Sequence, residues 1–294
     1  MLLAPDAFFN WPGPRILMDI RPAAVFVKGS MAGAVSVPVV SFGTWEIFTA
    51  ALQEHHPTQA VHVIDTDGKL AAPLAADKEV FCLAGGYRAF QRWRQAVFAS
   101  GPPIGLVGGK TGSGKTELLQ TLFRMGRQVV DLEDLARHKG SVFGDTKEKQ
   151  PPPEVFQNQL LSAWQRLDAA VPVWMEEKGA ALGKVGIPET LYARMCRAVV
   201  FELLTSLEER LQHLQQEYRG ADQVLFASCI RKLEKRMGFS ANHKALHYHQ
   251  TGQLEKCLRG LLAYYDQAYD QNRKARPPAA LFQVPAAVFR MPGK

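Results

Sequence analysis

The chain has 294 residues, of which 47% are hydrophobic and 21% are charged, values typical of a folded globular protein. At roughly 100–200 residues per domain, this length suggests two domains. No apolar run reaches the roughly 18 residues that a membrane helix needs, and the N-terminal residues 1–15 lack the basic region of a signal peptide. We therefore expect a cytoplasmic protein that does not enter a membrane.

The net charge indicates which partners the chain could bind, and the cysteine spacing indicates which metal or disulfide sites it could form. Lys and Arg exceed Asp and Glu by 35 to 28, a net charge of +7, which weakly favours polyanionic partners such as nucleic acid or nucleotides. No two of the four cysteines (Cys82, Cys196, Cys229 and Cys257) have C-x-x-C spacing. We therefore expect neither a zinc site nor a disulfide framework, and no cluster of side chains that binds a metal ion.

The first hundred residues indicate a small α/β domain with a parallel sheet. Short apolar runs at 16–18, 37–40 and 61–64 predict strands, and helix-like stretches such as 44–53 lie between them. Ser100-Gly-Pro-Pro103 breaks the pattern. The sequence thus predicts one domain over residues 1–101 and a second over 102–294.

The second part begins as an α/β pattern and becomes helical. The expected elements are a strand at 104–107, a helix at 117–126, a strand at 128–132, a loop at 139–153, a helix at 154–168 and a strand at 172–175. Apolar spacings of three and four then predict helices at 188–204, 207–218, 221–237 and 254–269, with a final strand at 280–284.

A glycine-rich loop follows the strand at 104–107 and matches G-x-x-x-x-G-K-[ST]. Glycines let backbone N–H groups approach phosphate oxygens, and the following helix presents its positive end. A lysine here supplies charge to the phosphates and a hydroxyl can bind Mg²⁺. The expected phosphate-binding residues are Gly109, Thr111, Gly112, Gly114, Lys115 and Thr116.

A carboxylate at the end of a neighbouring strand would complete such a site if Mg²⁺ is used. Asp131 follows the apolar run at 128–130, and Glu176 follows the one at 172–175. Either residue could instead cap the helix that follows its strand.

A second loop, in the first domain, carries a thiol. An apolar strand ends in Cys82, Gly85-Gly86 form a turn, and a helix begins near Tyr87. If the sulfur lies at the helix N-terminus, the helix dipole favours its thiolate, and Arg88 adds positive charge. The alternative is a buried cysteine at the end of a core strand.

Together the two loops resemble the bacterial tRNA 2-selenouridine synthases, which join a rhodanese-like domain to a P-loop domain. The most specific similarity is VDLEDLARHKGSVFG at residues 130–144, which resembles the family block DLE-x-LA-x-H-x-G-S-x-FG. The similarity covers about residues 104–270. Before that, DIRP at 19–22 and GAVSVP at 33–38 resemble rhodanese motifs, but Ala84 and Ala89 replace the usual Arg and Ser beside Cys82. In the second part of the chain, Lys178-Gly179 replaces the Glu-Ser that usually follows the Trp-x-Glu motif.

The resemblance implies an enzyme that replaces the 2-thio sulfur of the wobble uridine in certain tRNAs with selenium. Selenophosphate would be the selenium donor, and geranyl diphosphate would form a geranylated intermediate. Cys82, with Arg88, would carry the chalcogen step. In the 130–144 block and nearby, Asp131, Glu133, His138, Ser141 and Glu176 are candidate acid or substrate contacts.

Two further expectations remain open. Arg231, Lys232, Lys235 and Arg236 repeat at a spacing of four, which could form a basic stripe that contacts tRNA phosphates or simply a solvated helix face. The alternative function is a P-loop NTPase or kinase-like protein whose rhodanese-like domain is a non-catalytic interaction module. The oligomeric state is not indicated by the sequence.

Overall fold

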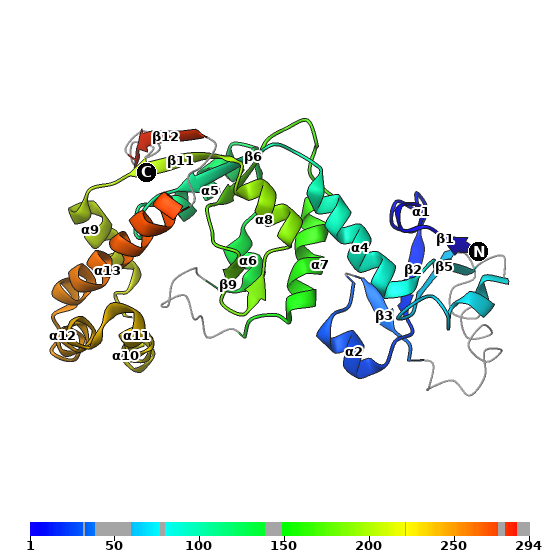
Figure 1. Ribbon diagram of the computed structural model, residues 1–294, viewed down its shortest axis with the longest axis horizontal. Coiled ribbons are helices and arrows are strands. Elements are labelled where there is room, and N and C mark those ends of the chain that lie inside the picture. The colour runs from blue at the N-terminus through cyan, green and yellow to red at the C-terminus, as the bar shows by residue number, and fades with distance from the viewer. Residues whose placement is uncertain are drawn as a thin grey trace. The chain divides into compact units, whose positions relative to one another are not determined.

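A computed structural model describes residues 1–31, 33–38, 60–76, 80–138, 149–220, 222–275 and 280–286 (Figure 1). The chain forms two compact units. Unit 1 contains residues 1–100, 151–166 and 188–191, and unit 2 contains 101–150, 167–187 and 192–294. Two short segments from beyond residue 150 thus belong to the first unit, a grouping that the sequence pattern does not reveal.

Unit 1 is built on a parallel sheet with the described strand order β1-β5-β4-β2-β3 (Figure 1). Its strands are β1 Leu2–Leu3, β2 Arg15–Asp19, β3 Ala34–Ser36, β4 Ala60–Ile64 and β5 Val80–Leu83. Its helices are α1 Pro5–Phe9, α2 Ala23–Lys28, the 3₁₀ helix η2 Ala72–Ala76, α4 Gly86–Ala99 and α7 Pro153–Trp164. The predicted parallel α/β architecture of this part is confirmed.

The D-x-R motif at the end of β2 forms a buried ion pair between Asp19 and Arg21. Arg21 donates hydrogen bonds to both carboxylate oxygens of Asp19 and to the carbonyl of Gly29, and its guanidinium lies 3.6 Å from the centre of the Tyr87 ring. Both charged side chains are almost fully buried. Removing one partner of such a pair leaves an uncompensated buried charge. The pair therefore stabilises the end of β2 only while both residues are present.

His62 lies in the core of unit 1, on β4, among aromatic rings. Its ring is buried, stacks on Phe81 and contacts Phe8 and Trp11 edge-on. Burial, together with the charge of Arg15, lowers the pKa of His62 to about 4 from its ordinary 6.5. The folded state therefore holds this imidazole neutral.

We expect acid to destabilise unit 1 through His62. Between pH 6.5 and about 4 the unfolded chain protonates His62 and the folded chain does not. The contribution of His62 to the free energy of unfolding is therefore fully present above pH 6.5, and it falls by about 1.4 kcal/mol per pH unit below pH 6.5. Urea unfolding from pH 7 to pH 4.5 measures this slope. His62→Phe, which keeps the ring contacts, should flatten it, and an unchanged slope in that variant would contradict the assignment.

Unit 2 carries a second parallel sheet, with the described order β12-β11-β6-β8-β7. Its strands are β6 Ile104–Gly108, β7 Gln128–Val129, β8 Val173–Glu176, β11 Val199–Leu204 and β12 Ala280–Pro285. Helices α5 Lys115–Arg124 and α6 Leu132–Ala136 follow β6 and β7, and a small antiparallel pair, β9 Ala181–Leu182 and β10 Val185–Gly186, follows β8.

One predicted helix was wrong. Only Glu189–Met195 of the segment 188–204 forms a helix, α8, and Val199–Leu204 forms strand β11 between β6 and β12. The run VVFELL is rich in β-branched and aromatic residues and is partly buried on both sides, so it has no clear alternation and can imitate a helix pattern. The expected strand at 280–284 is confirmed and pairs in parallel with β11.

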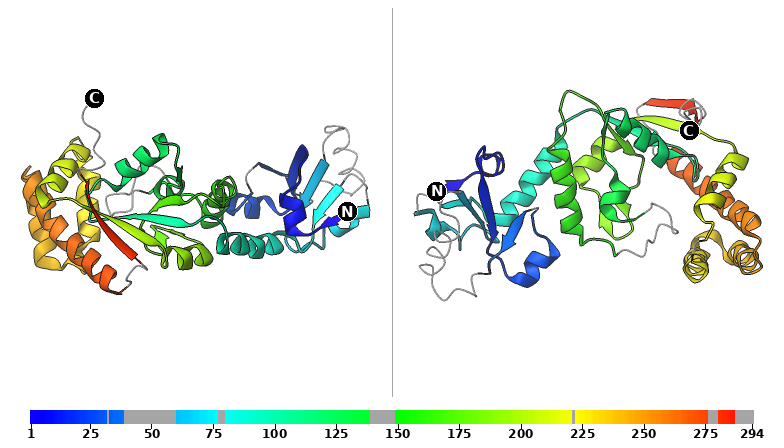
Figure 2. Two further views of the ribbon diagram at one scale, coloured as in Figure 1. Left: turned by 90° about the horizontal axis from the view of Figure 1, so that it is seen from above. Right: turned by 180° about the vertical axis from the view of Figure 1, so that it is seen from behind.

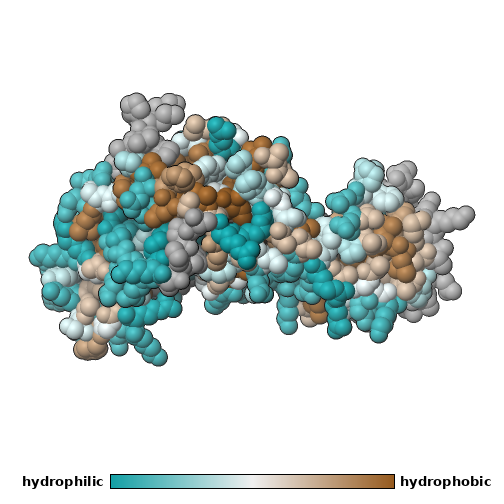
Figure 3. Space-filling view, turned by 45° about the horizontal axis from the view of Figure 1, so that its top comes forward, coloured by the Kyte–Doolittle hydropathy of each residue, from teal (hydrophilic) through white to brown (hydrophobic). Residues whose placement is uncertain are grey.

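The rest of unit 2 is helical, as predicted. Helices α9 Leu207–Glu217, α10 Gln223–Lys232, α11 Glu234–Met237, α12 Phe239–Gln250 and α13 Leu254–Ala275 enclose a core that includes Leu211, Phe226, Ile230, Leu258 and Leu261. Helices α12 and α13 lie side by side in both views of Figure 2. The face of these helices that Figure 3 shows is mainly hydrophilic. Helix α12 was missed, because its sequence FSANHKALHYHQ is largely polar.

Several expected elements shift or lie outside the described residues. The strand expected at 37–40 is found at Ala34–Ser36, and the helix expected at 44–53 is outside the described part, as are residues 139–148 of the expected loop. In the described part of the chain, no helix combines the length and apolar character needed to cross a membrane.

Candidate functional site

The glycine-rich loop joins β6 to α5 as predicted. Gly109, Gly112 and Gly114 have φ of +135°, +80° and +92°, in the left-handed region that favours glycine, and Gly114 caps α5. A Cβ atom on Gly112 would lie 3.0 Å from Leu214 Cγ and 3.1 Å from the Arg210 carbonyl. The glycine positions therefore follow from backbone shape and from close packing against α9.

Lys115 is the first residue of α5, and its side chain folds back onto the glycine-rich loop. Its ammonium donates to the carbonyls of Gly109 at 2.9 Å and Lys110 at 3.2 Å, and lies 3.7 Å from Glu176 Oε1. Burial lowers the pKa of Lys115, although Glu176 opposes the shift. A phosphate oxygen offers this ammonium a charged acceptor in place of two neutral carbonyls, a stronger kind of hydrogen bond.

Three charged side chains face Lys115 from the neighbouring elements. Glu176 is the last residue of β8, Glu133 lies in the first turn of α6, and Lys178 follows β8. The Lys178 ammonium donates to Glu176 Oε1 at 2.7 Å and also to the Glu133 carboxylate. Burial and the neighbouring Glu176 raise the pKa of Glu133, whereas Lys178 lowers it. The structure thus brings Glu133 and Glu176 together at the loop, with Lys178 between them.

Asp131 caps helix α6. Its Oδ1 accepts hydrogen bonds from the backbone N–H groups of Glu133 and Asp134, both at 3.0 Å, at the start of α6. This geometry is that of an N-cap, the alternative that the sequence left open. A role for Asp131 in the site remains a prediction.

A divalent cation does not fit the described residues of this site. The two carboxylates that would bind it are both paired with the Lys178 ammonium, and no group of three His, Cys, Asp or Glu residues in the described part of the chain could hold a metal ion. Thr116 lines the adjoining cavity, so its hydroxyl remains available to a bound phosphate compound.

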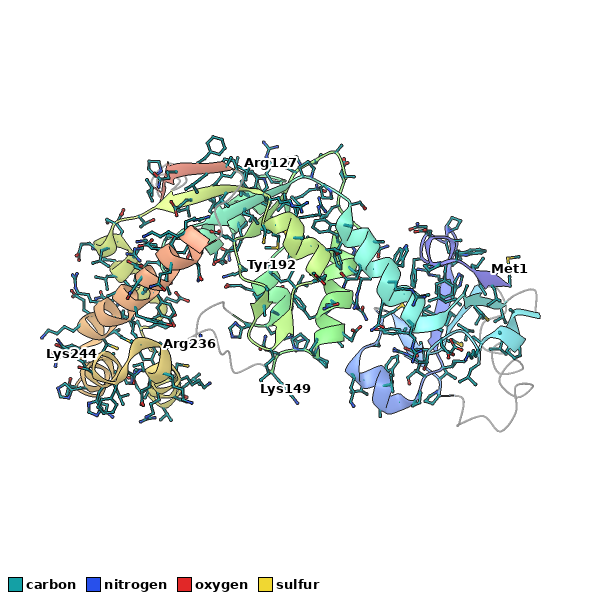
Figure 4. All side chains as sticks on the ribbon, in the orientation of Figure 1. Met1, Arg127, Lys149, Tyr192, Arg236 and Lys244 are labelled. Atoms are coloured by element: carbon teal, nitrogen blue, oxygen red, sulfur yellow. The ribbon has the colours of Figure 1, made fainter. Side chains whose placement is uncertain are left out.

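Two cavities open on either side of this charged centre. The first, here called the phosphate lobe, has a volume of about 510 Å³ and is lined by residues 111–117 of the loop, by Glu133 and by α9 residues such as His213. The second, the tyrosine lobe, has about 420 Å³ and is lined by Tyr192, Tyr265, Tyr269 and Arg273, among others. Thr111, Lys115, Glu176 and Lys178 line both lobes. Figure 4 labels Tyr192, which lies on α8.

Helices α9 and α13 hold the loop in place through Arg210, Asp266 and Tyr269. Buried Arg210 donates to the Thr111 carbonyl at 3.2 Å and forms a two-pronged ion pair with Asp266 at 2.8 and 2.7 Å. The Tyr269 hydroxyl accepts from the Gly109 N–H at 3.1 Å and donates to Glu202 at 2.7 Å. The sequence motif gives no signal for these contacts, because they come from 99 to 160 residues further along the chain.

Beside Tyr269, an ion pair between Arg273 and Glu177 lines the tyrosine lobe. Arg273 binds both oxygens of Glu177 at 2.8 and 2.7 Å, and its guanidinium lies 5.2 Å from the Tyr269 ring centre. Burial and the hydrogen bond to Glu202 raise the pKa of Tyr269, so this phenol stays neutral. The lobe is therefore lined by aromatic side chains, including the neutral phenol of Tyr269, beside the charged centre.

The other candidates of the 130–144 block fall elsewhere. His138 is half-buried, its side chain lies beside Gly183, and it lines neither lobe. Its buried Nδ1 has no hydrogen-bond partner among the described residues. Ser141 lies outside the described residues.

The structure places Cys82 in the core of unit 1. Strand β5 continues through Leu83, and Cys82 shares a fully buried cluster with Val63, Ala71, Leu74 and Val80. Side chains alternate along a strand, so Cys82 and Val80 point to the same covered face. The thiol donates to the Ala71 carbonyl at 3.0 Å, and burial raises its pKa to about 11.

Asp65 holds in place the turn at residues 68–71 that covers the Cys82 sulfur. Its carboxylate accepts backbone hydrogen bonds from Gly68, Leu70 and Ala71, which fixes the turn above the sulfur. Arg88 lies on α4 with an exposed side chain, whereas the Cys82 sulfur is buried. In this structure the Cys82 thiol is thus a buried core cysteine, the alternative that the sequence left open. A chemical role for Cys82 and Arg88 remains a prediction.

The basic residues of the C-terminal part lie on the surface. Arg231 and Lys232 end α10, and Lys235 and Arg236 lie in α11, all four exposed. Leu233 interrupts the two helices, so the four side chains do not continue along one regular helix. Figure 4 labels Arg236 and, on α12, Lys244. Contact with tRNA remains a prediction for these residues.

A parallel sheet with a glycine loop between strand β6 and helix α5 is consistent with a P-loop α/β domain. Sequence comparison extends this assignment: the family model described as "tRNA 2-selenouridine synthase AAA domain" matches residues 102–287. The chain belongs to this enzyme family.

Curated relatives agree with this assignment. The chain is similar to proteins named tRNA 2-selenouridine synthase from Cronobacter sakazakii (28% identity over 79% of this chain and 71% of the relative), Hydrogenovibrio crunogenus (30%, 71% and 66%) and Proteus mirabilis (27%, 69% and 65%). The matches thus span about two thirds of the relatives' length. No solved structure matches the chain.

Proposed function

We propose that unit 2 of this chain modifies the wobble 2-thiouridine of tRNA, using phosphate compounds bound at the glycine-rich loop. Geranyl diphosphate is the proposed alkyl donor and selenophosphate the proposed selenium donor. The observation that carries the proposal is the placement of Lys115, Glu176 and Lys178 at the junction of two lobes.

The two lobes suit the two parts of such a reaction. The phosphate lobe offers the loop, the N-terminus of α5 and two ammonium groups, which match an anionic diphosphate. The tyrosine lobe offers aromatic faces, which suit an unstacked base. The reacting atoms would then meet between the lobes, beside Lys115.

The first step in this proposal is an alkyl transfer. The 2-thio sulfur forms a bond to the allylic C1 carbon of the geranyl group, the C1–O bond breaks, and diphosphate leaves with that electron pair. The alkylated base then gives its N3 proton to water or to the released diphosphate. Lys115 and Lys178 lie where they can stabilise the charge on the leaving diphosphate. The step needs no thiolate from the protein, in keeping with the burial of Cys82.

Release of diphosphate tests this proposal against the NTPase alternative. We expect the purified chain to release diphosphate from geranyl diphosphate when 2-thiouridine tRNA is present, and not with tRNA that carries unmodified uridine. Hydrolysis of ATP or GTP should stay at background without tRNA. Robust NTP turnover, with no diphosphate release from geranyl diphosphate, would instead support a P-loop NTPase with a non-catalytic first unit.

A further inference from the structure

Lys178 occupies the centre of the site in a way that the glycine-loop motif does not require. Its ammonium bridges Glu133 and Glu176, and the three side chains are only 14%, 16% and 7% exposed. They come from three separate places: the segment after β8, the first turn of α6, and the end of β8. A cation is thus built into the fold between two acidic side chains.

Among the described residues of this centre, acidic and basic side chains are equal in number. The carboxyl groups of Glu133 and Glu176 face the ammonium groups of Lys115 and Lys178. Although burial opposes its charge, Glu176 and Glu133 raise the pKa of Lys178, so it stays an ammonium. A divalent cation placed here would meet two ammonium groups and would find both carboxylates already paired.

Lys178 also lines both lobes, so it can contact what binds in them. When an anion enters the phosphate lobe, Lys115 exchanges its loop carbonyls for phosphate oxygens, while the carboxylates hold Lys178 beside it. Two fixed ammonium groups would then face one diphosphate. An ammonium is a compact cation with three donors, well suited to this role.

We propose that Lys178 takes the place of the divalent cation at this site, so that the chain binds diphosphate without Mg²⁺. The inference rests on the proposed function in one respect, namely that a phosphate group binds at the glycine-rich loop. It adds that Lys178, rather than a metal ion, provides the second positive charge.

Calorimetric titration of the full chain with inorganic diphosphate, in EDTA and in excess Mg²⁺, tests the inference. We expect the wild-type dissociation constant to agree within about threefold between the two conditions. Lys178→Ala should weaken binding in EDTA by about tenfold or more, since one charged hydrogen bond is worth about 1.5–3 kcal/mol. Mg²⁺ should restore part of this loss, because the variant frees Glu133 and Glu176.

The control is Lys184→Ala, which removes an equal charge from an exposed lysine that lines neither lobe. It should bind as the wild type does in both conditions. Wild-type binding that disappears in EDTA and returns with Mg²⁺ overturns the role of Lys178 and leaves the proposed function standing. No binding of diphosphate in either condition overturns the phosphate assignment that both proposals share. The wild-type comparison holds even if Lys178→Ala fails to fold.

Discussion

Lys115→Ala is expected to weaken binding of the diphosphate co-substrate by roughly ten- to hundredfold, the value of one charge-assisted hydrogen bond. Lys115 is the loop residue whose ammonium lies at the junction of the lobes, 3.7 Å from Glu176. Its present partners are the neutral carbonyls of Gly109 and Lys110, so a phosphate is a better acceptor than either. Calorimetry with geranyl diphosphate measures the loss.

Lys110→Ala is the matched control for this experiment. Lys110 belongs to the same loop, but its ammonium pairs with Asp270 at the surface, where both side chains are substantially exposed. Such exposed pairs contribute little, so we expect less than about a threefold change in affinity. Equal effects of the two substitutions, or none for Lys115→Ala, would contradict the assignment of Lys115 to the phosphate.

Cys82→Ala is expected to leave diphosphate binding and diphosphate release unchanged. The thiol is fully buried, and burial raises its pKa to about 11, so at pH 8 only about one molecule in a thousand carries the thiolate. In the native protein, iodoacetamide at pH 8 should therefore label half-exposed Cys196 well before Cys82. Peptide mass spectrometry after timed labelling gives the order.

Two outcomes would return Cys82 to a chemical role. One is labelling of Cys82 as fast as Cys196 in folded protein. The other is loss of tRNA modification in Cys82→Ala while circular dichroism and the midpoint of thermal unfolding stay close to those of the wild type. Cys196→Ala serves as the control, because it removes the more accessible thiol.

The sequence predicted the parts of the site that are local in the chain. The glycines at 109, 112 and 114 mark left-handed backbone, and Lys115 follows them at the start of a helix, so the motif and its neighbouring strand and helix were sufficient. Glu176 was predicted from its position at the end of an apolar strand, and the structure places it at Lys115.

What the sequence could not predict depends on contacts across the chain. That Asp131 caps helix α6 is decided by which N–H groups face it, and the local pattern of a strand followed by a helix does not predict them. The burial of Cys82 depends on the turn that Asp65 organises, which local pattern does not show. β11 was missed because a strand buried on both faces lacks the alternation that identifies strands.

Lys178 illustrates the same limit in the site itself. In the sequence it is one lysine that departs from a family pattern, with no sign of a function. Only the fold shows that Glu133, 45 residues earlier in the chain, and Glu176 both pair with its ammonium. Residue type alone could not distinguish this bridging position from that of an exposed lysine.

The most direct test of the account is nucleoside mass spectrometry of tRNA after incubation with the purified chain, geranyl diphosphate and selenophosphate. The account predicts that 2-thiouridine tRNA yields geranylated nucleoside with the wild type and with Cys82→Ala, and much less with Lys115→Ala. Formation of 2-selenouridine would extend the proposal to the selenium step. Unchanged nucleosides with folded wild-type protein, or full product with Lys115→Ala, would contradict the claim that this chain modifies tRNA at its glycine-rich loop.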